Sequence, residues 1–373
     1  ASLLERPKAL ASLRVAYLIP HHNVTGGMKM IVAQIRLLGA RGHKVTVVFR
    51  GPPGSPVLPP WASDVEVAAA VLLGTHDTIE PVMRDNDVVV IGYFTQLLEF
   101  AAITQPVGPI VYWDQGHEHL FGDATASLEW DKVFHQVMHL PIALLSVSTV
   151  VKEILATHFS RVAPVVPNAI DTSVFYPPPA PVDYDSAVKH VLIVGHPGLA
   201  LKNFATALCV LNNVHQVFPD LKVTWMCQQE PVVSAATFPV EFVVNPAQAE
   251  VPNVYRRGFH AMLFTSFYEA WGMPVMEAMA TGIPVVTSCC FGVDMFCKSG
   301  VNCLMAEPAD VGRLSEHLIK VLGSPELSSQ FSKAGVATVK DFTWDKTMTA
   351  FEDCLTLVAC RLGTLQSRLE VDP

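Results

Sequence analysis

The sequence predicts an α/β protein built from two Rossmann-like domains, and three observations lead to this fold class. The chain has 373 residues, of which half are hydrophobic and only 16% are charged, which is enough apolar material for two packed cores. A buried strand, a glycine-containing turn and an amphipathic helix open the chain. The same pattern then starts again after a proline-rich segment at 176–185.

The first series occupies the beginning of the chain. Residues 14–20 form a short apolar run that predicts a buried strand, and a loop containing Thr25, Gly26 and Gly27 follows it. Apolar residues then recur at helical spacing until glycines end the helix before a strand at 44–49. We expect further strands at 87–91, 110–113 and 144–147, and a loop over the proline-rich stretch 51–61.

The second series follows the proline-rich segment, which has no apolar periodicity and is typical of a linker. It predicts a strand at 190–195, a loop through Lys202, a helix that ends near Phe218 and a strand at 221–227. Two such series joined by a linker predict two domains that face each other across a cleft.

The stretch 261–288 continues the second series. It predicts a buried strand over 261–265, a helix whose first turn suits Pro274, and a strand over 284–287 after Gly282. The final stretch, 344–362, again has apolar residues at helical spacing, so we expect a terminal helix there.

Charge and cysteine content exclude several classes of protein. Lysine and arginine total 25 against 34 acidic residues, a balance opposite to that of most nucleic-acid-binding proteins. The longest nearly apolar stretch, 140–151, is too short to cross a bilayer. All eight cysteines follow position 208 without a CxxC pair, so we expect reduced, mostly buried thiols in a cytoplasmic protein.

The predicted strand at 261–265 and the helix after it are the best candidates for a binding site. In open α/β sheets ligands bind beyond the carboxyl ends of the strands, which is where Glu269 is expected. Backbone amides around Gly272, Met273 and Val275 would lack partners within the helix, so they could bind a diphosphate. Glu277, one turn further on, suits the vicinal hydroxyls of a ribose, although alone it is better explained as a first-turn acid that favours the helix dipole.

Three motifs in order resemble the retaining glycosyltransferases of family 4, which have the GT-B fold. The family signature, E-G-F-G-x-P-x-x-E-A-M-A, corresponds to Glu269-Ala-Trp-Gly-Met-Pro-Val-Met-Glu277-Ala-Met-Ala. Residues 165–177 (VVPNAIDTSVFYP) resemble the family's passage into its second domain, and residues 194–203 (VGHPGLALKN) resemble its "VGR…KG" loop. The resemblance covers essentially the whole chain.

The resemblance implies a role for each matching residue. Glu269 would hold hydroxyls of the donor sugar, Glu277 the ribose, and Lys202 the diphosphate. Gly26 and Gly27 would support the diphosphate through their backbone. His117 would lie beside the reacting sugar, so the expected catalytic residues are His117, Glu269 and Lys202. The donor would be bound by a larger set: Gly26, Gly27, His196, Lys202, Gly272, Met273, Pro274, Val275 and Glu277.

The resemblance also implies a domain organisation. It gives an N-terminal acceptor domain at 1–175, a C-terminal donor domain at 176–343, and a helix at 344–373 that crosses back to the first domain. One departure concerns the diphosphate. The family's arginine after "VG" is His196 here, which replaces a permanent cation with a titrating group. Either Lys202 carries most of the diphosphate, or Arg256 or Arg257 substitutes.

Aromatic and histidine side chains of the first domain are the candidate acceptor site: His21, His22, Trp113 and His119. They suit a saccharide or another polyol, and a lipid-linked glycan with peripheral membrane contact stays open. Asp114, His117 and His119 are close in sequence, but a transition-metal site needs convergent geometry and a further ligand, so we expect none.

The resemblance therefore implies a metal-independent, retaining hexosyltransferase without a cofactor, which moves a sugar from a nucleoside-diphosphate donor to an acceptor hydroxyl. The motifs do not distinguish UDP-linked from GDP-linked sugars. Two alternatives stay open: a sugar-nucleotide 2-epimerase of the same fold, and a subunit that binds sugar nucleotides without catalysis.

Overall fold

The computed structural model describes residues 12–101, 109–121, 124–231 and 236–369. These residues pack into two compact units. The first unit takes its described residues from Ala1–Gly116, Glu129–Asn168 and Asp345–Pro373, and the second from His117–Leu128 and Ala169–Trp344. The described residues 117–121 thus belong to the second unit, although they lie within the stretch 1–175 that was expected to form the first domain.

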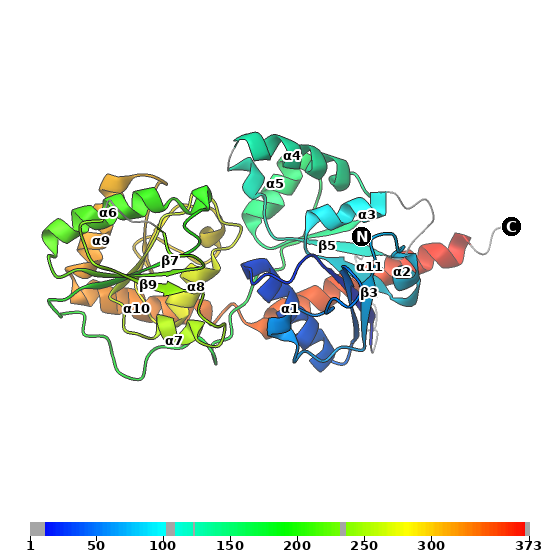
Figure 1. The fold of residues 1–373 in the computed structure, drawn as a ribbon, viewed down its shortest axis with the longest axis horizontal. Helices are drawn as coiled ribbons and strands as arrows, with labels where there is room; N and C mark the ends of the chain where they lie inside the picture. The colour runs from blue at the N-terminus through cyan, green and yellow to red at the C-terminus, as the bar shows by residue number, and fades with distance from the viewer. Residues whose placement is uncertain (1–11, 102–108, 122–123, 232–235, 370–373) are drawn as a thin grey trace, which may run out of the picture. The chain divides into compact units, whose positions relative to one another are not determined.

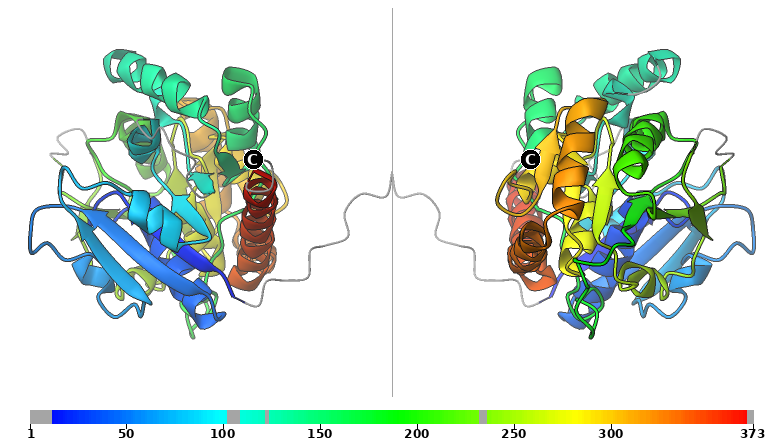
Figure 2. Two further views of the ribbon diagram at one scale, coloured as in Figure 1. Left: turned by 90° about the vertical axis from the view of Figure 1, so that its right-hand side faces the viewer. Right: turned by 90° about the vertical axis from the view of Figure 1, so that its left-hand side faces the viewer.

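The first unit contains a parallel sheet of six strands in the order β3-β2-β1-β4-β5-β6. This is the order of a Rossmann fold. The strands lie side by side and twist together (Figure 2, blue and cyan). Their bounds are β1 (Arg14–Ile19), β2 (Lys44–Arg50), β3 (Ala69–Leu73), β4 (Val88–Ile91), β5 (Ile110–Asp114) and β6 (Ala143–Ser146).

The described helices that accompany this sheet are α1 (Gly26–Ala40), α2 (Glu80–Asp85), α3 (Leu98–Ala101), α4 (Ala124–Met138), which belongs to this unit from Glu129 on, α5 (Thr149–Phe159) and α11 (Trp344–Leu369), which belongs to it from Asp345 on. Helix α1 begins where the Thr25 hydroxyl accepts a hydrogen bond from the Met28 amide at 3.2 Å. Gly26 and Gly27 are therefore the first two residues of a helix and not part of the loop that the sequence predicted. The reason is that the Thr25 cap lets the helix start before the first apolar residue.

Helix α11 completes the core of the first unit. Met348, Phe351 and Leu355 are fully buried, and the Phe351 ring lies 6.4 Å from the indole of Trp113 on β5. On the outer side, Arg41 donates to Glu352 at 2.8 Å and forms an ion pair with Asp345 at 2.8 Å. The apolar spacing in 344–362 thus corresponds to a helix whose buried stripe faces this unit.

The second unit repeats the same topology. Its six strands run parallel in the order β12-β11-β10-β7-β8-β9, which is the first sheet's order read from the opposite edge. The bounds are β7 (His190–Val194), β8 (Lys222–Cys227), β9 (Val240–Val244), β10 (Ala261–Phe264), β11 (Val285–Ser288) and β12 (Leu304–Ala306).

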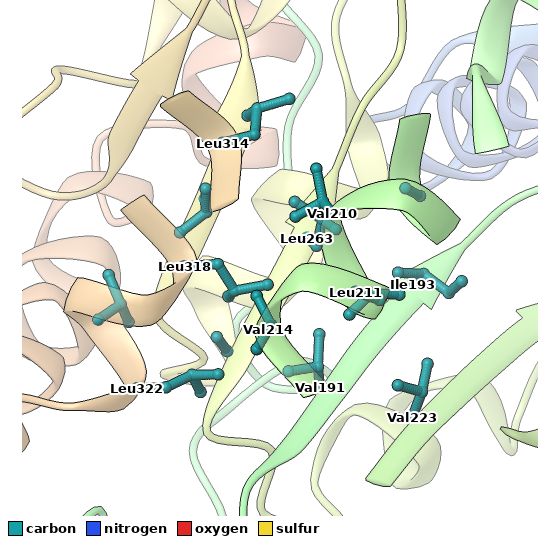
Figure 3. Packing of buried hydrophobic residues seen from close by; sticks show 14 of the residues in the cluster. Val191, Ile193, Val210, Leu211, Val214, Val223, Leu263, Leu314, Leu318 and Leu322 are labelled. Atoms are coloured by element: carbon teal, nitrogen blue, oxygen red, sulfur yellow. The ribbon is translucent and has the colours of Figure 1, made fainter. Parts of the chain in front are cut away.

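The helices of the second unit are α6 (Phe204–Val217), α7 (Val251–Tyr255), α8 (Met273–Ala280), α9 (Val311–Leu322) and α10 (Pro325–Val339) (Figure 1). Helices α6 and α9 share one core with the sheet. Val210 and Val214 of α6 and Leu314 and Leu318 of α9 point toward strand residues such as Leu263 (Figure 3). All of these side chains are fully buried, so this core holds the strand ends in place beneath the loops described below.

Short 3₁₀ helices lie in the described connections: η1 (Pro60–Ala62), η2 (Phe94–Leu97), η3 (Glu118–Leu120), η4 (Ala200–Lys202) and η5 (Gly292–Met295). Within the described ranges, no helix combines the length and the apolar character that a bilayer span requires.

Each sheet has one point where the strand order reverses. In the first unit it lies between β1 and β4, and in the second between β7 and β10. The loops that leave two such neighbouring strands diverge to opposite faces and leave a crevice at the carboxyl edge, which is the usual ligand position in this fold.

Candidate functional site

An ion pair lies at the point of strand-order reversal in the second unit. Lys202 ends the loop after β7, and Glu269 lies in the loop after β10. The Lys202 Nζ is 2.5 Å from Glu269 Oε1, and the two side chains are 21% and 12% exposed. The Ser266 hydroxyl donates to the same carboxylate oxygen at 2.7 Å. The structure therefore brings together two of the three expected catalytic residues.

Hydrogen bonds between the two loops fix the position of this pair. The Thr265 hydroxyl donates to the carbonyls of Lys202 and Asn203, and the Phe267 amide donates to the Leu201 carbonyl at 2.8 Å. Burial lowers the pKa of Lys202, but the negative charge and hydrogen bond of Glu269 outweigh it and leave that pKa above its ordinary value. The ammonium is thus a fixed positive charge at the carboxyl edge of the sheet.

The loop that carries Glu269 is paired with the loop after β11. The Glu269 amide donates to the Cys290 carbonyl at 2.9 Å, and the Gly292 amide donates to the Glu269 carbonyl at 2.8 Å. Glu269 and Phe291 form an isolated parallel bridge. A Cβ on Gly292 would overlap the backbone of Ala270 and Trp271, so only glycine allows the loops to approach this closely.

Helix α8 begins directly after this loop, at Met273, with Pro274 in its first turn. Gly272 precedes it with φ +92°, a conformation that favours glycine. The Val275 amide donates to the Gly272 carbonyl at 3.0 Å, so the expectation that Val275 offers a free amide is corrected. Gly272 and Met273 retain the helix N-terminal amides that can face an anion.

Glu277 lies in the second turn of α8 and is 9% exposed. Burial raises the pKa of Tyr255 well above its usual value, and the charge of Glu277 and a hydrogen bond with it raise that pKa further. The Tyr255 hydroxyl also approaches the Pro274 carbonyl at 3.4 Å. Tyr255 is thus a neighbour of the Glu277 carboxylate that the sequence motif did not indicate.

The cations that could replace the family's arginine are mostly engaged elsewhere. The Gly198 amide donates to His196 Nδ1 at 3.0 Å, so this ring nitrogen acts as an acceptor. Arg256 donates to the Val174 carbonyl and lies over the Tyr176 ring at 4.3 Å, and Arg257 pairs with Glu241 at 2.8 Å. These contacts favour Lys202 over either arginine as the main charge for a diphosphate.

His117 is fully buried, and its amide donates to the Tyr268 hydroxyl at 3.2 Å. The rings of His117 and His119 lie 5.5 Å apart. Tyr268 stacks on Phe121 with 4.2 Å between ring centroids and 7° between planes. The sequence did not single out Tyr268 or Phe121, because each aromatic residue alone resembles an ordinary core residue.

The first unit has its own residues at the point of strand-order reversal. His21 follows β1 and its ring lies 6.3 Å from that of Tyr93, which follows β4. Burial lowers the pKa of His21, and its Nδ1 is buried without a hydrogen-bond partner. The ring of His22 stacks on Phe49 at 4.1 Å.

Trp113 differs from the other candidates for the acceptor site. Its indole is 1% exposed, packs against Phe351 and donates to the Val166 carbonyl at 3.4 Å. Trp113 is therefore a core residue of the first unit and is not placed to bind an acceptor. Among the residues that the structure describes, no group of three or more histidine, cysteine, aspartate or glutamate side chains is placed to hold a metal ion.

Part of the chain matches a known protein family. Residues 239–337, which include Glu269 and Glu277, match the family described as Glycosyl transferases group 1. O-antigen chain mannosyltransferase B of Escherichia coli is 32% identical over 101 residues, which are 27% of this chain and 26% of that protein. D-inositol 3-phosphate glycosyltransferase of Streptomyces griseus is 27% identical over 100 residues, which are 27% of this chain and 21% of that protein. The match thus spans about a quarter of the length of these curated relatives.

Solved structures resemble the chain over nearly its whole length. The structure of a glycosyltransferase from Rickettsia africae aligns over 93% of this chain and 98% of that protein, with a TM-score of 0.72 and 12% sequence identity. The structure of Anabaena HepE in complex with UDP and glucose aligns over 95% of this chain and 100% of that protein, with a TM-score of 0.70 and 13% sequence identity. The chain has the GT-B fold. Together with the family match, this fold supports a GT-B glycosyltransferase.

Proposed function

We propose that this GT-B protein is a glycosyltransferase that moves a sugar from a nucleoside-diphosphate donor to an acceptor hydroxyl. The observation that carries the proposal is the Lys202–Glu269 ion pair at 2.5 Å, placed at the point of strand-order reversal beside the N-terminus of α8. A fixed ammonium and backbone amides suit a diphosphate, and a carboxylate suits sugar hydroxyls.

The proposed donor site uses residues of the second unit. Lys202 and the amides of Gly272 and Met273 stabilise the negative charge that grows on the diphosphate as the glycosyl–phosphate bond breaks. Glu269 accepts hydrogen bonds from hydroxyls of the donor sugar, and Glu277 accepts them from the ribose. His117 lies beside the reacting sugar. For Gly26, Gly27, His21 and His22, which belong to the first unit, the proposed roles rest on the family resemblance alone.

We further propose that the transfer retains the configuration of the anomeric carbon and needs no metal. The bond from the anomeric carbon to the phosphate oxygen breaks, and the acceptor oxygen bonds to that carbon on the same face. The departing phosphate oxygen takes the acceptor's proton, so no protein nucleophile is required. The resemblance to family 4 supports this stereochemistry, and Lys202 supplies the positive charge that a metal provides in other transferases.

A thermal-shift screen of UDP-, GDP-, ADP- and dTDP-sugars tests the donor class. We expect one nucleotide series to raise the Tm, because a ligand that binds only the folded state stabilises it. Release of the matching nucleoside diphosphate with a saccharide or polyol acceptor would then demonstrate transfer. An epimerised sugar nucleotide formed without any acceptor would favour a 2-epimerase, and binding without either transfer or slow hydrolysis would favour a non-catalytic subunit.

A further inference from the structure

Phe291 is a bulky residue in a backbone conformation that such residues rarely adopt. Its φ is +70° and its ψ is −75°. The Gly292 amide donates to the Cys290 carbonyl at 3.0 Å, which closes a γ-turn around Phe291. A γ-turn of this hand is rare and strained for any residue with a Cβ, whereas glycine adopts it freely. The sequence nevertheless places a large aromatic side chain here.

Burial of the ring does not explain this choice, because the residue is 41% exposed. Its ring centroid lies 5.3 Å from that of Phe121 and 6.1 Å from that of Tyr268. Phe121 and Tyr268 stack on each other, and Tyr268 is 2% exposed. Phe291 is thus the solvent-exposed member of a three-ring cluster, with two packed rings behind it. Strained residues of this kind concentrate at functional sites.

The backbone of Phe291 is paired with that of Glu269, a member of the ion pair. Phe291 is the bridge partner of Glu269, and hydrogen bonds on both sides of it, from Glu269 to Cys290 and from Gly292 to Glu269, fix the pairing. Because Lys202 and Ser266 hold the Glu269 carboxylate, both the carboxylate and the neighbouring backbone of Phe291 have set positions.

We propose that Phe291 is a specificity-determining residue that contacts the sugar of the bound nucleotide sugar. This inference rests on the proposed function. One face of a pyranose ring carries mainly C–H groups, whose hydrogens are electropositive, and the face of an aromatic ring is electronegative. Glu269 would bind hydroxyls at the edge of the sugar while Phe291 covers a C–H face. The site therefore favours hexoses that present one face without axial hydroxyls.

The test compares the affinity for a nucleotide sugar with that for the matching free nucleoside diphosphate, both measured by calorimetry. Phe291→Ala and Phe291→Gly both remove the ring, but only glycine also relieves the backbone strain. We expect each variant to weaken nucleotide-sugar binding about three- to tenfold and to leave nucleoside-diphosphate binding unchanged. Phe291→Tyr keeps the ring and should restore the wild-type ratio of the two affinities.

Ala309 provides a matched control, because it is exposed and also has a positive φ, +65°. Ala309→Gly should raise the Tm and leave the affinities for the nucleotide sugar and for the nucleoside diphosphate unchanged. Phe291→Gly should likewise have a higher Tm than Phe291→Ala. Equal weakening of both ligands, or recovery of sugar binding in Phe291→Gly, would show that the ring acts through the fold and would overturn the inference. Unchanged affinity ratios in both variants would overturn it as well. If the wild-type protein bound no nucleoside diphosphate at all, the proposed function would fail together with it.

Discussion

Lys202 and Glu269 form a 2.5 Å ion pair although 67 residues separate them in the sequence. They meet because β7 and β10 are neighbours in the sheet, so that the loops leaving these strands share one edge. The pairing has a chemical consequence. A lysine with a raised pKa stays charged throughout the physiological range, so the site presents a permanent positive charge with a carboxylate beside it.

Removing either member of this pair should abolish sugar transfer. Lys202→Ala takes away the charge that faces the diphosphate, and losses of about 100- to 1000-fold in kcat are typical for one such group. Glu269→Ala should be as harmful and should also lower the free energy of unfolding by about 1–3 kcal/mol, because a partly buried ammonium loses its hydrogen-bonded partner. Arg313→Ala, which breaks an exposed pair with Glu316, is the control and should keep full activity. Steady-state rates and circular dichroism would measure both effects, and full activity in Lys202→Ala would contradict the assignment.

Glu277→Gln should weaken binding of the preferred nucleoside diphosphate about tenfold. A charged acceptor for two ribose hydroxyls is lost, and hydrogen bonds to charged groups contribute about 1.5–3 kcal/mol. The effect should depend on the ribose. The wild-type protein should bind the 2′-deoxy nucleotide more weakly than the ribonucleotide, and the variant should discriminate less between them. Calorimetry would measure the affinity of the wild-type protein and of the variant for each of the two nucleotides. If both proteins preferred the ribonucleotide by the same factor, a ribose role for Glu277 would be ruled out.

Gly292→Ala should destabilise the second unit by about 1–3 kcal/mol, because the new methyl group overlaps the backbone of Ala270 and Trp271 and forces the loops apart. Gly39→Ala is a matched control in helix α1, where the added Cβ would have its nearest neighbour, the Glu66 carbonyl, at 3.8 Å. That variant should gain about 0.5–1 kcal/mol. Chemical denaturation would measure the two changes, and a stable Gly292→Ala protein would contradict the tight loop packing.

The stability of the second unit should fall as the pH drops below about 6.5. Burial lowers the pKa of His260, and the charge of Lys189 adds to this, although the hydrogen bond to the Asp183 carbonyl partly offsets it. The unfolded chain therefore takes up a proton near pH 6.5 that the folded chain resists. The stabilising contribution is complete above that pH and is lost as the pH falls through the folded pKa.

His260→Asn tests this effect. His260 Nδ1 accepts the His190 amide at 3.1 Å, and an asparagine oxygen can accept the same hydrogen bond without titrating. The Tm of the variant should depend less steeply on pH between about 5 and 7 than that of the wild-type protein. Parallel Tm curves for the two proteins would exclude His260 as a source of the acid sensitivity.

Most strands could be predicted from apolar periodicity, but β3, β9 and β12 could not, and of the described helices only α1, α6, α8 and α11 were predicted. Strand β12 has only three residues, which is too short for a clear pattern. Ala69–Leu73 and Val240–Val244 form the outer edge strands β3 and β9, and their side chains are mostly half-buried or exposed. Edge strands bury little surface, so their sequences lack the continuous apolar run that marks a central strand. These two strands can be assigned only from the strand pairing in the structure.

The part of the candidate site that lies in one contiguous sequence motif could be predicted. Glu269, Glu277 and Pro274 lie in one short stretch, so their order and spacing indicated a turn and a helix start. Contacts between distant segments were not predictable. The roles of Tyr255 beside Glu277 and of Phe291 beside Glu269 depend on tertiary packing, which no local pattern encodes. For the same reason Trp113, expected to bind an acceptor, lies in the core against α11.

Helix α11 has a consequence for how the protein is made. Its Phe351 packs on Trp113 and its Thr347 hydroxyl donates to the Pro167 carbonyl at 3.0 Å, yet the ribosome synthesises it only after the whole of Ala169–Trp344. The first unit therefore cannot complete its core until α11 is synthesised, and part of its apolar interior stays uncovered until then. The second unit can already fold at that stage. During translation that apolar surface therefore stays exposed to solvent until helix α11 has emerged.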